Sequence, residues 1–238
     1  MNAPDARAPD SAGMTPAECD SLLANPALLR AALEFNGLCA PPDLGSEGSL
    51  SGALAGALHT LLATHPRLWS CFSTPAQQRT AWDFAPKPNR LALLPPPLLE
   101  RLSLYWSAAV RAEELARIIE KTRLAPIMAE IGTEVYRYAV RRGRFQLGGL
   151  RPLLRREESA DATAWRGETF RQPGDAMLSR CFARWPESLR AAWTERWRRP
   201  LPEASARPSA VSFSALWFWL EKILLREVAP EWQPCFNS

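Results

Sequence analysis

Histidine and lysine are scarce in this sequence of 238 residues, which has two histidines and three lysines, the latter at positions 87, 121 and 222. His59 and His65 lie six residues apart, off one face of a helix, and no HExxH motif occurs. Neither a zinc site nor a histidine-assisted nucleophile is therefore expected. Glycines at the spacing GxGxxG, or GxxxxGK followed by Ser or Thr, are also missing, so no phosphate-binding loop is predicted.

Cysteine pairs of the kind that bind metals are missing, because the five cysteines are spread along the chain with no CxxC spacing. Wide separations and an odd number argue against a zinc site and a disulfide framework, so reduced thiols are expected. The longest largely apolar run, Phe213 to Leu220, is far shorter than the roughly 20 residues that cross a bilayer. The N-terminal residues have neither the cationic start nor the apolar core of a secretory signal. We therefore expect a cytoplasmic protein without a transmembrane segment.

A strong excess of one charge is also missing, since 29 cations face 25 anions and the net charge is +4. This balance does not demand a nucleic-acid partner. Nearly all the cations are arginine, which a GC-rich genome explains more simply than selection for the guanidinium group. One basic cluster contains an aromatic residue: Arg137, Arg141, Arg142, Arg144 and Arg151, with Phe145. A solvated helix end that complements the helix dipole explains most of this cluster, so nucleic-acid binding is not predicted.

The stretch Leu98–Arg144 carries the strongest helical signal, because its apolar residues recur at helical spacing throughout. Three prolines precede it and Gly143 closes it. Pro126 interrupts the stretch, so a boundary is predicted near Thr122–Ala125. A helix of roughly 20 residues on each side would span about 30 Å. We predict that this pair of long helices is the centre of the fold.

Other helices are predicted from capping residues, prolines and glycines. They cover residues 15–23, 26–36, 49–64, 174–184, 187–198 and 211–228, with a brief turn at 74–82. Residues 1–14 are expected to be disordered. The Pro-rich segment Ala85–Pro97 is interpreted as a hinge, and Phe145–Pro173 as mostly loop with a short strand-like piece at Phe145–Leu147.

Strand periods and fixed-length repeats are not visible. The sequence therefore predicts a mainly α fold: an irregular multi-helix bundle organised on a central pair of long helices, with little or no sheet. Residues 15–238 are predicted to form a single helical domain. A subdivision into N-terminal helices at 15–90 and a core with C-terminal helices at 97–238 remains open.

Acid/base chemistry is not indicated, because the paired carboxylates, Glu113–Glu114 and Glu157–Glu158, are adjacent and would point about 100° apart on a helix. No enzyme and no cofactor are predicted. Tryptophan is the one departure from average composition, with ten residues, seven of them in the last third. Trp217 and Trp219 would point to different sides of a helix. Trp217 is expected in the core, whereas Trp219 is open to either a core or an interface role.

The segment LLERLSLYW…ELARIIEKTRLAPIMAEIGTEVYRYAVRRG resembles the central region of SctK, a sorting-platform component of type III secretion (the YscK/PscK family). The later segment GDAMLSRCFARWPESLRAAWTERWRRPLP and the apolar helix after it are similar to the C-terminal layout of that family. The resemblance covers about Leu98 to Phe236. It implies a non-enzymatic cytosolic adaptor at the cytoplasmic face of the inner membrane. Its partners would be the cytoplasmic domain of an SctD-like ring protein, an SctQ-like pod protein and, less directly, an SctL-like stator.

Partner-binding residues cannot be transferred by motif, because the family has no short signature that fixes them. We predict Arg141, Arg142 and Arg144 on one rim, and Trp219 and Trp232 on the C-terminal surface. A competing hypothesis is a regulatory or chaperone-like protein that binds one partner through its Trp-rich C-terminal region.

Overall fold

The computed structural model describes residues 22–36, 81–156, 168–199, 201 and 211–237. Every regular element in these ranges is a helix, so the predicted mainly α fold is confirmed. None of the described helices is long and apolar enough to span a bilayer. The predictions for residues 1–14 and 49–64, for most of the helix at 15–23 and for most of the turn at 74–82, concern residues outside these ranges.

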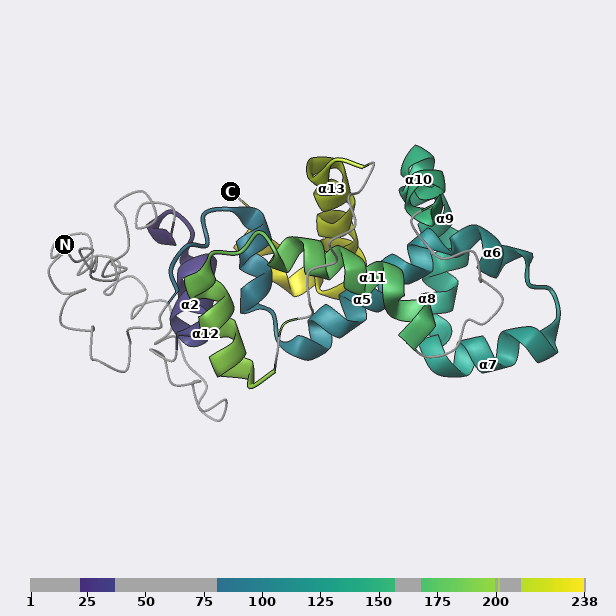
Figure 1. Ribbon diagram of the computed structural model, residues 1–238, viewed down its shortest axis with the longest axis horizontal. Helices are drawn as coiled ribbons and strands as arrows, with labels where there is room; N and C mark the ends of the chain where they lie inside the picture. The colour runs from purple at the N-terminus through teal and green to yellow at the C-terminus, as the bar shows by residue number, and fades with distance from the viewer. Residues whose placement is uncertain (1–21, 37–80, 157–167, 200, 202–210, 238) are drawn as a thin grey trace, which may run out of the picture.

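The described elements are strung along one long axis (Figure 1). At one end lie α2 (Pro26–Phe35) and α12 (Glu187–Trp197), and at the other lie α6 (Ala112–Arg117) and α7 (Lys121–Ile131). Between them, α5 (Pro96–Val110) and α11 (Glu168–Phe182) pack against each other over much of their length. The molecule is therefore elongated, with its central pair of helices in the middle.

The central pair consists of two helices of 15 residues each, α5 and α11. Pro96 and Pro97 occupy the first positions of α5, where a missing N–H costs nothing. Ten residues of α5 are buried, including Tyr105 and Trp106. Residue contacts pair later positions of α5 with earlier positions of α11, so the two helices run antiparallel.

The second member of this pair was predicted wrongly. The continuation of α5 is divided by extended backbone at Ile118 and Glu120 and by Gly132, whose φ is 84°. Pro126 lies inside α7, which continues past the missing donor, so the predicted boundary at Thr122–Ala125 falls instead at residues 118–120. The short helices α6 and α7, followed by α8 (Thr133–Tyr138), take the place of the predicted continuous helix, and after the break at Gly132 the chain packs against α5 again through α8.

The region predicted as loop is partly helical. A π turn, η3 (Ala139–Gly143), leads into α9 (Arg144–Gln146), the 3₁₀ turn η4 (Gly148–Leu150) and α10 (Arg151–Arg156). The strand-like piece at residues 145–147 is therefore wrong. Helix α11 begins at Glu168 rather than at Gly174, and carries Pro173 in its interior.

The other predicted helices that fall in the described ranges are confirmed. Helix α2 is capped by Asn25, whose Oδ1 accepts a hydrogen bond from the N–H of Leu28 at 3.0 Å. Helix α12 ends at Arg198, which has a left-handed φ of 50°. The last predicted helix is α13 (Phe213–Ile223), prolonged by the π turn η5 (Leu224–Val228).

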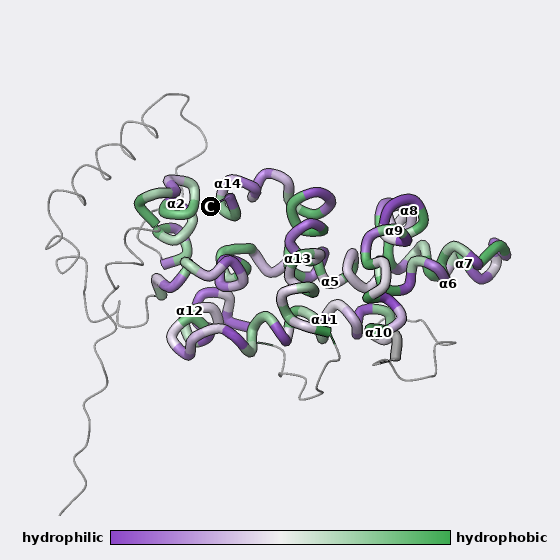
Figure 2. The backbone as a smooth tube through the Cα atoms, turned by 90° about the horizontal axis from the view of Figure 1, so that it is seen from above, coloured by the Kyte–Doolittle hydropathy of each residue, from purple (hydrophilic) through white to green (hydrophobic). Residues whose placement is uncertain are grey.

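The first and last segments of the described chain meet at one corner of the core. Side-chain Nδ2 of Asn25 donates to the carbonyls of Pro234 and Asn237, at 2.8 and 3.0 Å. Figure 2 shows α14 (Gln233–Phe236), which follows the 3₁₀ turn η6 (Pro230–Trp232), beside α2. The Pro-rich segment forms the 3₁₀ helix η2 (Lys87–Leu93), and residues 89–94 are buried. Residues on both sides of the predicted 15–90 and 97–238 subdivision thus share one core.

Candidate partner-binding surfaces

Three arginines that the composition analysis treated as a codon effect are buried, at 1% exposure for Arg90, 3% for Arg111 and 4% for Arg151. Each donates hydrogen bonds to backbone carbonyls. Arg90 binds the carbonyls of Phe84, Ala85 and Cys235, at 2.8, 3.2 and 3.0 Å. These contacts hold the segment before η2 against the C-terminus. They use the planar fork of the guanidinium, which lysine does not have.

Arg151 is the second such clamp, and it removes one member from the predicted basic cluster. Its guanidinium donates to the carbonyls of Ala109, Gly143 and Arg144, at 3.3, 2.8 and 2.7 Å. It also forms a 2.9 Å ion pair with Glu113. Arg151 therefore ties α10, α5 and the end of η3 together and does not belong to a surface. A cation directly before Pro-Leu-Leu was the only sequence signal for its burial.

The third buried arginine, Arg111, lies at the interface between the end of α5 and the start of α11. Pro173 has no N–H for the carbonyl of Thr169, and Nη2 of Arg111 donates to that carbonyl at 2.9 Å. Ser107 Oγ donates to the carbonyl of Arg171 at 3.1 Å and accepts from the N–H of Gly174 at 2.9 Å. Polar groups on α5 thus replace bonds that the proline removes, which is why α11 continues through a Pro-Gly pair.

The predicted rim residues Arg141, Arg142 and Arg144 lie close together on η3 and α9, but their contacts differ. Arg142 donates through Nη1 to both carboxylate oxygens of Glu227, each at 3.0 Å. This ion pair joins the π turn η3 to the π turn η5. Arg141 and Arg144 are exposed, and the guanidinium of Arg144 lies 4.9 Å from the ring centre of Phe145. Phe145 is 71% exposed.

The π turn η3 is packed directly on α5. A Cβ added at Gly143 would lie 3.2 Å from the Cα of Ala109, so only a small residue fits at this position. Beside it, the hydroxyl of Tyr138 donates to Oε1 of Gln146 at 2.6 Å. Burial, with the nearby Glu227 carboxylate, raises the pKa of Tyr138 well above its usual range. The inner side of this segment is therefore fixed, and only its outer side is available to a partner.

The two predicted tryptophans lie on other elements. Trp219 of α13 is partly buried, with the ammonium of Lys222 4.8 Å from its ring and the Phe218 ring edge-on at 5.3 Å. Phe218 is 50% exposed. Trp232 lies in η6, partly buried against the core. The described contacts join Arg142 to the C-terminal segment through Glu227, whereas Trp219 has Lys222 as its neighbour.

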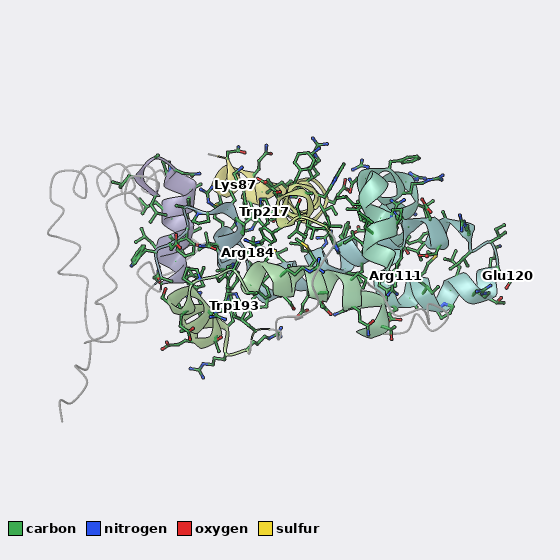
Figure 3. The ribbon with its side chains drawn as sticks, turned by 45° about the horizontal axis from the view of Figure 1, so that its top comes forward. Lys87, Arg111, Glu120, Arg184, Trp193 and Trp217 are labelled. Carbon is green, nitrogen blue, oxygen red and sulfur yellow. The ribbon has the colours of Figure 1, made fainter. Side chains whose placement is uncertain are left out.

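Most other described tryptophans serve the core. Trp185 and Trp193 form an aromatic cluster with Phe182, with ring centres 4.5 to 6.4 Å apart. Trp217 is stacked on Phe213, whose other contact is the Arg184 guanidinium at 4.0 Å (Figure 3). Trp217 therefore covers the core edge, and the expectation of a mainly structural role agrees with this placement.

The far end of the molecule offers a third exposed apolar residue. Glu120 lies at the tip in Figure 3, between α6 and α7, and the adjacent Ile119 is 90% exposed. Only Ile131 of α7 is buried. The projection is therefore attached mainly by its C-terminal end.

Groups suited to metal or thiol chemistry do not cluster in the part of the chain that the structure describes. No set of three or more potential metal ligands is found there. Cys181 and Cys235 are buried, and burial raises the pKa of each thiol, so both stay protonated near neutral pH. The described surfaces are thus suited to binding through cations and apolar side chains.

Comparison with known proteins gives no match: no protein-family model fits the chain, and no curated protein and no solved structure is significantly similar to it.

Proposed function

We propose that this protein is a non-enzymatic adaptor of a type III secretion sorting platform. In this role it links the cytoplasmic domain of an SctD-like inner-membrane ring protein to pods of SctQ-like and SctL-like proteins. It would work in the cytoplasm, held at the cytoplasmic face of the inner membrane by these contacts. The observation that carries the adaptor role is an elongated helical body with exposed apolar residues on separate elements. The assignment to this secretion system rests on the resemblance of residues 98–236 to SctK.

An adaptor has to bind two partners at once, so its binding surfaces must not overlap. Among the residues that the structure describes, three large apolar side chains are exposed: Ile119 on the α6–α7 tip, Phe145 on α9 and Phe218 on α13. Each has a cation beside it in sequence or in space, namely Lys121, Arg144 and Lys222. An apolar anchor with a charged rim is a common composition for reversible interfaces of modest area.

The predicted binding residues take unequal parts in this proposal. Arg141 and Arg144 remain on the proposed binding rim, whereas Arg142, although exposed, is paired with Glu227. Trp219 would contribute through its outer edge, together with Phe218 and Lys222. Trp232 would have a smaller part, because it packs against the core.

The alternative is a regulatory or chaperone-like protein with one partner on the C-terminal region. Exposure of Phe218 beside Trp219 and Lys222 is the observation that favours it. Under this alternative a single binding event would occupy α13, and no ternary complex would form.

Co-purification tests the proposed function directly. The full chain is mixed with the SctD-like cytoplasmic domain and with the SctQ-like protein of the same genome, separately and together, and each eluted complex is weighed by light scattering. The adaptor proposal predicts two binary complexes and one ternary complex. A chain that remains monomeric with both proteins refutes it, and binding to an unrelated single partner through α13 would support the alternative.

A further inference from the structure

Two adjacent arginines of the π turn η3 have different surroundings: Arg142 is paired with Glu227, whereas Arg141 is exposed without such a pair among the described residues. In an α-helix, residues four apart are offset by about 40° around the axis. A π turn takes more residues per turn, so this offset shrinks across residues 139–143. Arg137, Arg141 and Phe145, each four residues apart, therefore come close to one line along the outer side. Arg142 is offset from this line by about 80–100° around the axis and forms the ion pair with Glu227.

The cations on this outer line are not used within the described part of the protein. Arg137 and Arg141 are exposed, and neither forms an ion pair with a residue that the structure describes. Arg144 lies beside the line, with its guanidinium stacked on Phe145. We name this set, Arg137, Arg141, Arg144 and Phe145, the arginine–phenylalanine surface. It offers three guanidinium groups around one exposed aromatic ring.

We propose that the arginine–phenylalanine surface binds an acidic helical segment of a protein partner. Carboxylates one helical turn apart on that segment pair with Arg137 and Arg141, which are themselves separated by about 6 Å along the axis. Arginine suits this role because its fork can bind both oxygens of a carboxylate. An apolar side chain one turn beyond the carboxylate that pairs with Arg141 would lie on the ring of Phe145. This inference rests on the proposed function, since it names the chemistry of one partner at the same rim.

Carboxylates alongside the surface favour a protein over a nucleic acid. Glu134 lies one turn before Arg137 and is exposed, with Arg101 at 3.5 Å, and Glu130 is also exposed. A continuous phosphate backbone would pass close to these negative charges. A protein helix carries separate carboxylates that avoid them. The net charge of +4 is also small for a protein that binds by releasing counterions from nucleic acid.

Binding is measured with two kinds of probe by fluorescence anisotropy. The first is a short labelled alanine-based helical peptide with two glutamates four residues apart and a leucine one turn beyond them, with a glutamine version as its control. The second is the SctD-like domain or the SctQ-like protein, whichever forms the complex. The variant is Arg137→Glu with Arg141→Glu, and a further variant is Phe145→Ala. For the glutamate peptide, Arg123→Glu with Arg117→Glu is the control, because these arginines are exposed on the α6–α7 projection, away from the arginine–phenylalanine surface.

The double charge reversal is expected to weaken binding of the glutamate peptide by roughly tenfold or more for each arginine. Phe145→Ala should weaken it by a smaller factor, the control variant should bind within about twofold of the wild type, and the glutamine peptide should bind weakly to every variant. Equal effects of the test and control variants would overturn the inference, as would tighter binding to duplex DNA than to the peptide.

The two proposals fail in different ways. If a partner complex forms but is indifferent to Arg137→Glu with Arg141→Glu and to Phe145→Ala, the proposed surface is wrong and the adaptor function stands. If neither partner binds while the glutamate peptide binds with the expected losses, the surface is correct and the sorting-platform function is wrong. Circular dichroism of each variant checks that the exposed substitutions leave the helical fold intact.

Discussion

At the scale of single residues, Gly174 has the least room for a side chain among the glycines that the structure describes. A Cβ added there would lie 2.0 Å from the carbonyl oxygen of Ser103, which is backbone and cannot move aside cheaply. The neighbouring Ser103 hydroxyl donates to Asp175 at 2.5 Å, so the two helices are already held at this distance. The closest approach of α5 and α11 therefore depends on a glycine in the interior of a helix.

Gly174→Ala should destabilise the protein by at least about 2 kcal/mol, since overpacking of this kind forces the helices apart. Helix propensity alone would predict the opposite change in stability, because alanine is the better helix former by about 1 kcal/mol. A loss of stability would therefore report the overpacking. Gly149→Ala is the matched control, because its Cβ would meet no atom within 4 Å, and it should change stability by less than about 0.5 kcal/mol. Urea denaturation followed by circular dichroism measures both. Equal stability of the two variants would contradict the packing argument.

At the residue scale, composition does not distinguish the buried arginines from the exposed ones. Arg90 and Arg151 lie in sequence contexts that resemble those of surface arginines, and the codon explanation treats them alike. Their carbonyl acceptors include Cys235 for Arg90 and Ala109 for Arg151, 145 and 42 residues away. No local pattern contains that information. Part of the arginine excess is therefore structural.

At the scale of elements, helices whose ends are marked locally were predicted well. Asn25 caps α2, and the apolar spacing of residues 211–228 predicted α13 with its extension. The start of α11 was missed because Pro173-Gly174 reads as a turn, and the groups that rescue the helix, Ser107 and Arg111, lie on α5. The two π turns were also missed, since they keep the apolar spacing of a helix.

Some features of the candidate binding rim could be predicted from the sequence, and others could not. Exposure of Arg141 and Arg144 follows from a basic helix end, which the sequence indicates directly. The engagement of Arg142 does not, because its partner Glu227 is 85 residues away and reaches it only when η5 packs beside η3. Phe145 was noticed for its place among the arginines, but its exposure depends on how η3 turns the chain.

Helix α7 is expected to be the least protected of the longer helices. Only one of its 11 residues is buried, against ten of 15 in α5. Its first turn has no acidic residue and its last turn no basic residue, so the helix dipole is not compensated. Amide hydrogens of α7 should exchange on the order of 100-fold or more faster than those of α5.

Hydrogen exchange followed by mass spectrometry gives this comparison in a single experiment. Ile131→Ala, which removes the one buried side chain of α7, should speed exchange in α7 and leave α5 almost unchanged. Equal protection of the two helices in the wild-type protein would contradict this account. It would mean that contacts beyond those described hold the projection in place.

At the scale of the whole molecule, the corner formed by α2, η2 and α14 joins the two ends of the described chain. Phe236 is fully buried there, and Arg90 binds the carbonyl of the residue before it. Asn25 adds hydrogen bonds from the other side. The last residues of the chain are therefore part of the core and not an appendage to it.

Phe236→Ala should lower the free energy of unfolding by about 3–5 kcal/mol, the usual result of emptying a fully packed aromatic site. Phe218→Ala makes the same chemical change on the exposed side of α13 and should cost less than about 1 kcal/mol. The midpoints of urea unfolding curves compare the two. If both variants unfolded at the same midpoint, burial of Phe236 at this corner would not contribute more to the free energy of unfolding than the exposed Phe218, and the prediction would be wrong.

The π turn at residues 139–143 has a consequence for how sequences of this kind can diverge. Such a turn contains one residue more than an α-helical turn, so losing a single codon within AVRRG would convert it to regular helix. The lost residue and the larger twist per residue of the α-helix nearly cancel, so the segments on the two sides would keep almost the same relative orientation. Inside the turn, however, either Arg137 and Arg141 or Arg141 and Phe145 would become three residues apart, and would be offset by about 60° around the axis while the helix itself survived. One in-frame deletion could thus erase a binding surface without unfolding the element that carries it.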